Sequence, residues 1–114
     1  MSQVEAIRLE LVQRMSEEEH MLNSPEVQQN FQNSTDPKVK SDFMKLRISY
    51  SAEVAKLKNA ILEKIAIQLQ NLEPQLKSAL DNLNAQLESL QNQVAILNAI
   101  KNVTNLVANI VSVV

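Results

Sequence analysis

A chain of 114 residues with no Gly, no Cys and three Pro has the size of a single domain, and its lack of turn residues argues against a strand-rich fold. Good helix formers are abundant, so we predict an all-α fold. Without Cys, disulfides and Cys-ligated zinc are excluded, which fits a cytoplasmic location. The net charge is −2 and no Lys/Arg stripe is evident, so the sequence lacks the basic patch that is typical of nucleic-acid-binding proteins.

The N-terminal residues 1–5 are polar and do not form a signal peptide. The first helix is predicted over residues 2–22, where apolar side chains recur along one stripe at helical spacing. Glu17 and His20 reproduce the Glu-x-x-His spacing of di-iron bundles. Because the chain contains one His and no second such motif, we interpret this pair as solvated surface and predict no metal site.

Two proline signals mark the next helix starts. In Ser24-Pro25, a capping Ser precedes a Pro at the first helical position, which predicts a short helix over residues 25–32. Asp36-Pro37 repeats the signal after a loop and begins a long helix, predicted over residues 37–71. Its apolar surface widens between residues 60 and 67, where we expect another helix to pack.

Pro74 is the third signal. Asn71 as N-cap would place Pro74 in the first turn of a new helix over residues 74–112, and the two long helices would form an antiparallel hairpin. However, no Gly ends the preceding helix, and the apolar seams on either side of Pro74 are offset by only about 50°. The alternative is therefore one continuous, kinked helix of roughly 75 residues, which would need partner chains to cover it.

The apolar face of the C-terminal region changes sides near residue 95. Before that point, leucines at positions 76, 80, 83, 87 and 90 share a narrow seam, and beyond it the apolar side chains lie on the opposite side. Heptad drift of ~20° is too small to explain this change. Three interpretations remain: a helix break near residues 95–98, one straight helix that meets two different neighbours, or a lipid-facing C-terminal segment.

The region after the change of side carries the predicted interaction surface. Its apolar face is formed by Ile96, Ile100, Val103, Leu106, Val107, Ile110 and Val111. An amide stripe on the other side is formed by Asn98, Asn102, Asn105 and Asn109. Leaving the apolar face in water would cost roughly 1.5–3 kcal/mol per side chain, so we expect another chain to cover it. The amide stripe is either a plain polar surface or a contact between helices, and Asn side chains buried in such a contact can set its register and stoichiometry.

We therefore predict one helical domain over residues 1–114, a coiled-coil-like bundle with a long antiparallel hairpin and one or two shorter N-terminal helices. It would be a non-enzymatic interaction or assembly protein that forms a homo-oligomer or docks a helical protein partner. Motifs for phosphate binding or nucleophilic catalysis are missing, so we expect no catalytic residues, cofactor or small-molecule substrate, and no nucleic-acid partner. The uncapped apolar end also fits an N-terminal fragment of a longer protein.

The alternative function is a small amphipathic α-helical membrane-active or pore-forming protein, which would be membrane-associated instead of cytoplasmic. Residues 94–114 are long enough to span a bilayer at ~1.5 Å per residue. Lys101 near the centre of such a span would cost about 2.5–3.5 kcal/mol. This cost favours the interaction function over the membrane function.

Overall fold

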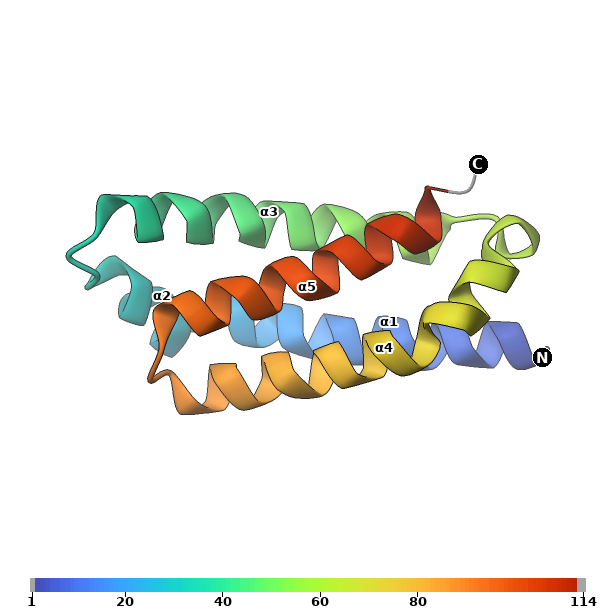
Figure 1. The fold of residues 1–114 in the computed structure, drawn as a ribbon, viewed down its shortest axis with the longest axis horizontal. Coiled ribbons are helices and arrows are strands. Elements are labelled where there is room, and N and C mark those ends of the chain that lie inside the picture. Colours follow the sequence, from blue (N-terminus) through green and yellow to red (C-terminus); the bar gives the residue numbers. More distant parts are fainter. Residues whose placement is uncertain (1, 113–114) are drawn as a thin grey trace.

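The computed structural model describes residues 2–112, which form five α-helices packed as one bundle (Figure 1). The helices are α1 (Gln3–Leu22), α2 (Pro25–Gln32), α3 (Pro37–Asn59), α4 (Leu62–Ser89) and α5 (Gln93–Val111). The described residues contain no strand, which confirms the predicted all-α fold.

The four long helices form a ring in which α1, α3, α5 and α4 follow one another as packed neighbours. Figure 1 shows that α1 and α4 run in one direction and α3 and α5 in the other. Consecutive helices α3 and α4 therefore occupy opposite corners, and the first turns of α4 cross the end of the bundle. The antiparallel hairpin of the structure is α4–α5, with the short α2 connecting α1 to α3.

The start of α2 and the start of α3 follow from local capping chemistry. The Ser24 hydroxyl accepts a hydrogen bond from the Val27 backbone amide, and the Asp36 carboxylate accepts one from Lys38 at 2.9 Å. In both helices a Pro occupies the first turn, where its missing N–H costs nothing. The short helix coincides with residues 25–32, as the sequence indicates.

Pro74 lies inside α4, so the predicted end of one helix at residue 71 and start of another at residue 74 are wrong. Proline removes the backbone hydrogen bond to the carbonyl of Gln70 and bends a helix. Both Pro74 and Gln70 are exposed, so water can bond that carbonyl. Because the seams before and after Pro74 nearly coincide, the helix keeps one buried face, and it bends from the end of the bundle onto the long axis (Figure 1).

The predicted helix over residues 37–71 is interrupted instead at Ala60 and Ile61. Both have extended backbone, with ψ of 148° and 115°, and no side chain caps the start of α4. Arg8 of α1 donates a hydrogen bond to the Ala60 carbonyl at 2.6 Å. The turn is thus fixed by a distant helix, and the widened apolar surface after residue 60, interpreted from the sequence as a packing site for another helix, did not predict it.

A second break, at residues 90–92, interrupts the predicted helix over residues 74–112. Leu90 has a left-handed backbone conformation with φ of 52°, which is usually adopted by Gly. Asn92 caps α5, because its side chain accepts a hydrogen bond from the Ala95 backbone amide at 3.0 Å. Asn30 of α2 donates to the Leu90 carbonyl and accepts from the Gln93 side chain at 2.8 Å. The apolar face thus changes sides because the helix breaks at residues 90–92, slightly before the break predicted at residues 95–98.

Candidate interaction surface

The predicted interaction face on α5 lies in the core of its own chain. Its members with no exposed surface are Ile96, Ile100, Val103, Val107 and Ile110. The other two, Leu106 and Val111, are half-buried against that core. Since α5 packs on α3 and α4, this face is covered without a second chain.

The amide stripe is the outer face of the same helix. All four residues of the stripe, Asn98, Asn102, Asn105 and Asn109, are exposed. Burying the apolar side of α5 turns its opposite side to solvent, because residues at a 3.6-residue period divide into an inner and an outer face. The stripe is therefore solvent-facing surface in the single chain.

Among the described residues one helix, α5, is long and apolar enough to cross a membrane, and less than half of its apolar window is buried here (44%). The core helix of a soluble bundle passes the same test of length and composition. The described residues contain no group of three His, Asp or Glu side chains that could hold a metal ion.

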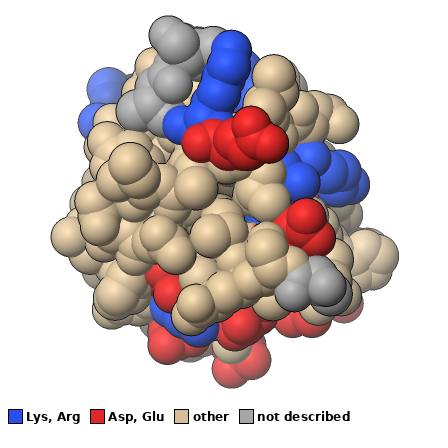
Figure 2. Space-filling view, turned by 90° about the vertical axis from the view of Figure 1, so that its right-hand side faces the viewer, with Lys and Arg blue, Asp and Glu red and all other residues tan. Residues whose placement is uncertain are grey.

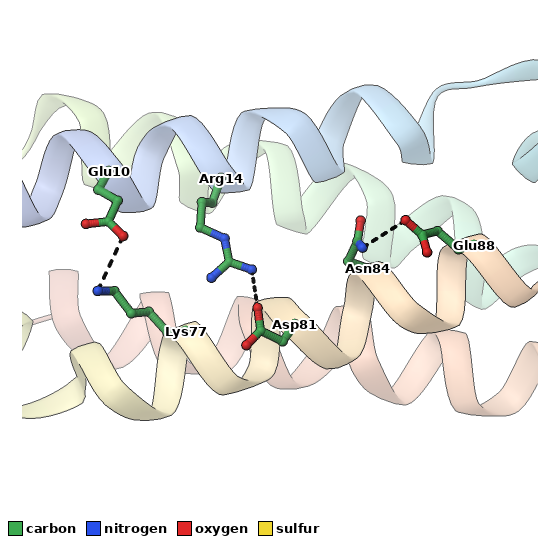
Figure 3. A network of polar contacts seen from close by, with 6 residues as sticks. All are labelled: Glu10, Arg14, Lys77, Asp81, Asn84 and Glu88. Carbon is green, nitrogen blue, oxygen red and sulfur yellow. Dashed lines mark hydrogen bonds and ion pairs between the residues drawn. The ribbon is translucent and has the colours of Figure 1, made fainter.

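Charged side chains between α1 and α4 are paired within the molecule. Lys77 of α4 contacts the carboxylates of Glu10 at 3.3 Å and Glu73 at 3.2 Å, and these hydrogen bonds raise the pKa of Lys77. About one helical turn further along the same two helices, Arg14 of α1 pairs with Asp81 of α4 (Figure 3). This seam links two helices of one chain and leaves little net charge for a partner.

Glu18 is a buried acid on the inner side of α1. Its side chain is 5% exposed, and one carboxylate oxygen has no hydrogen-bond partner among residues 2–112. Burial raises the pKa of Glu18 to about 7, and nearby Glu17 and Glu88 act in the same direction against the lowering effect of Arg14. The neighbouring Tyr50 hydroxyl donates to the Met15 carbonyl at 2.7 Å instead. A single carboxyl inside the packed core affects stability and offers a ligand no access.

The end of the bundle where α4 begins has a cleft of about 560 Å³ between α3, α4 and α5. Apolar residues such as Ile61, Ile65 and Val111 line it, together with Glu53, Lys56 and Lys64. Figure 2 shows uncharged residues across the middle of this end and charges of both signs around it. No single charge sign therefore distinguishes the cleft.

The outer side of α3 has a clear charge excess. This helix carries six Lys or Arg and two acids, a net charge of +4, whereas the whole chain carries −2 and the remainder therefore −6. The absence of a Lys/Arg stripe, inferred from the overall balance, is thus wrong for α3. Two of its cations pair with acids of the same helix, in Lys38–Asp42 and Lys56–Glu53, both at 3.1 Å.

An uncharged stripe runs along the exposed side of this helix, and we call it the α3 outer stripe. It consists of Ser41, Met44, Ile48, Ala52 and Ala55, all exposed. Met44 is 56% and Ile48 65% exposed, so two large apolar side chains face solvent one turn apart. At 100° per residue the stripe occupies a sector of about 80°.

Cations border the stripe on both sides. Helical geometry places Lys38, Lys45 and Lys56 along one edge and Lys40, Arg47 and Lys58 along the other. Lys40, Lys45 and Lys58 contact no acid within residues 2–112, so most of the excess positive charge is available to a partner.

A small cleft between α2 and α3 adjoins the stripe. It has a volume of about 160 Å³ and is lined in part by Phe31, Phe43 and Met44. The two Phe rings stack at 4.0 Å, and the Arg47 guanidinium lies 5.8 Å from the Phe43 ring centre. This packing holds Arg47 at the edge of the stripe and anchors α2 on α3.

Comparison with models of protein families, with characterised proteins and with solved structures gave no significant match.

Proposed function

We propose that this protein is a non-enzymatic interaction module that binds an acidic, amphipathic helix of another protein through α3. The observation that carries the proposal is the α3 outer stripe, an exposed uncharged ridge bordered by cations in a chain that is otherwise acidic. Exposed apolar side chains within a polar rim are typical of protein interaction sites.

The shape of the stripe favours a helix as the bound element. Met44, Ile48, Ala52 and Ala55 follow one another at intervals of four, four and three residues, the spacing of a ridge that fits the groove of a second helix. Its narrow width is that of a coiled-coil seam. The two Ala residues leave room for close approach of the partner backbone, while Met44 and Ile48 provide apolar contact.

The borders of the stripe favour a partner with acids beside its apolar seam. In helix pairs, charged residues flanking the seam select the partner and its orientation. The net charge of +4 on α3 would attract such a helix and accelerate its association, with a strong dependence on ionic strength. Rim charges contribute little affinity each, so the apolar contacts must supply much of the binding free energy.

A lipid surface matches this face less well. Helices that lie in a membrane interface insert a broad apolar face that is rich in Trp, Phe or Leu. The α3 outer stripe offers two large apolar side chains and no aromatic one. We therefore expect its cations to serve protein recognition.

The test uses a labelled synthetic helix with a Leu seam flanked by Glu, and a control helix with Lys in place of Glu. Fluorescence anisotropy should show binding of the Glu helix only. The Met44→Glu/Ile48→Glu variant should weaken binding by roughly tenfold or more, about 1.4 kcal/mol. The matched Asn102→Glu/Asn109→Glu variant, on the exposed side of α5, should change it much less. Equal binding of the two helices, or equal loss in both variants, would contradict the proposal. Binding to anionic vesicles without binding to the Glu helix would favour the membrane function.

A further inference from the structure

The outer face of α1 has the opposite charge pattern to α3. This helix carries five Glu and two Arg, a net charge of −3. Leu9, 49% exposed, lies at the centre of its outward side together with Gln13 and His20. At 100° per residue, Glu5 and Glu19 fall on one border of this face and Glu10 and Glu17 on the other.

Most of these border acids have no cation partner in the single chain. Glu10 contacts Lys77, whereas Glu5, Glu17 and Glu19 form no ion pair within the described residues. The cations Lys40, Lys45 and Lys58 of α3 are in the same situation. One molecule thus displays two unpaired borders of opposite sign, on two helices of similar length, 20 and 23 residues.

These two faces adjoin within one molecule but do not cover each other. α1 and α3 pack side by side in the bundle, and Glu5 and Leu9 of α1 line a cleft together with Lys58 of α3, while Met44 and Ile48 stay exposed. Complementary faces that are both exposed on one rigid chain can pair only between copies.

We infer that the α1 outer face of a second copy occupies the α3 outer stripe of the first. This inference depends on the proposed function, because it uses the same stripe and identifies the acidic helix as α1 of another copy. The contact joins two different surfaces, so each copy retains one unoccupied α1 face and one unoccupied α3 face, and association continues head to tail.

The contact is expected to be weak. A single helix pair buries an area at or below the low end of specific interfaces, less than about 1,200 Å². Leu9 is the single large exposed apolar side chain on the α1 side, so charge contributes a large part of the attraction. Association should therefore be reversible, increase with protein concentration and diminish as salt screens the charges.

Charge reversal tests the pairing directly. One variant, α3-reversed, carries Lys40→Glu, Lys45→Glu and Lys58→Glu. The other, α1-reversed, carries Glu5→Lys, Glu17→Lys and Glu19→Lys. Sedimentation velocity at low salt should show association of the wild-type protein and a monomer for each variant alone, because both helices of each variant then have the same sign. A mixture of the two variants should associate again, since each reversed helix meets a helix of opposite charge.

Circular dichroism of each variant controls for folding. A single chain that carries all six substitutions provides a second test. It should associate, because its two faces are again complementary. A wild-type protein that stays monomeric at low salt, or a mixture that fails to associate, would overturn the inference. If that monomer still binds the synthetic Glu helix through α3, the proposed function stands and only the second copy is excluded. Failure of both measurements would contradict both proposals.

Discussion

α3 and α5 lie side by side in the bundle but use their amphipathic character in opposite ways. α5 has eight buried residues among 19 and one charged side chain, Lys101. α3 has four buried residues among 23 and eight charged side chains. The helix with the more apolar sequence supplies the core, and the more polar helix presents exposed Met44 and Ile48 to solvent. A strong apolar face therefore indicates a need for burial without indicating which molecule provides it.

The largest expected effect comes from a charge placed on the inner face of α5. Val103 has no exposed surface, so Val103→Glu would bury an unpaired carboxylate and should lower the free energy of unfolding by about 4 kcal/mol or more. Thermal unfolding followed by circular dichroism measures this loss. The neighbouring Asn105→Glu, on the exposed side of α5, should change stability by no more than about 0.5 kcal/mol. Retained helicity in Val103→Glu together with a fall in molecular mass would instead assign this face to a contact between chains.

A smaller, pH-dependent effect is expected beneath α3, where Glu18 lies close to Tyr50. The folded protein raises the pKa of Glu18 from 4.5 to about 7, so the folded state binds the proton more tightly than the unfolded state does. The contribution of Glu18 protonation to the free energy of unfolding is therefore largest below pH 4.5. It declines as the pH rises towards 7 and is fully lost above that value. Glu18→Gln should therefore gain stability relative to the wild type across this range, by roughly 1–3 kcal/mol.

Urea unfolding of the two proteins at several pH values between 4 and 8 provides the measurement, since comparison with the variant removes the effects of other acids. A pH-independent difference between the two proteins would contradict the burial of Glu18. The inner face of α5 carries no ionisable group, as its buried polar residue is Thr104, whose hydroxyl donates to the Ile100 carbonyl at 2.8 Å. The pH response should thus be specific to the α1–α3 side of the core.

Part of this fold follows from local rules. The fold class and the starts of α2 and α3 could be predicted, because Ser24 and Asp36 cap helices that begin with proline. The turns at residues 60–61 and 90–92 could not, because neither contains Gly and Leu90 takes the left-handed conformation itself. Distant contacts fix both turns, from Arg8 to Ala60 and from Asn30 to Leu90.

The candidate surface was missed for a different reason. Burial of the α5 face depends on the turn at residues 90–92, which folds α5 back onto α3 and α4, so periodicity alone could not separate core from interface. The signal on α3 was present in the sequence, because a net charge counted for each helix separately shows its excess of Lys and Arg. Summed over the whole chain, the acids of α1 and α4 conceal it.

We propose that α3 and not α5 offers its apolar residues to a partner, and thiol labelling tests this assignment most directly. The chain has no Cys, so Ile48→Cys and Ile100→Cys each introduce a single reactive group, at an exposed and a fully buried position respectively. A maleimide reagent should label Ile48→Cys rapidly in the folded protein and more slowly when the Glu helix is added, and it should label Ile100→Cys only after unfolding. Rapid labelling of folded Ile100→Cys, with Ile48→Cys protected, would contradict this assignment.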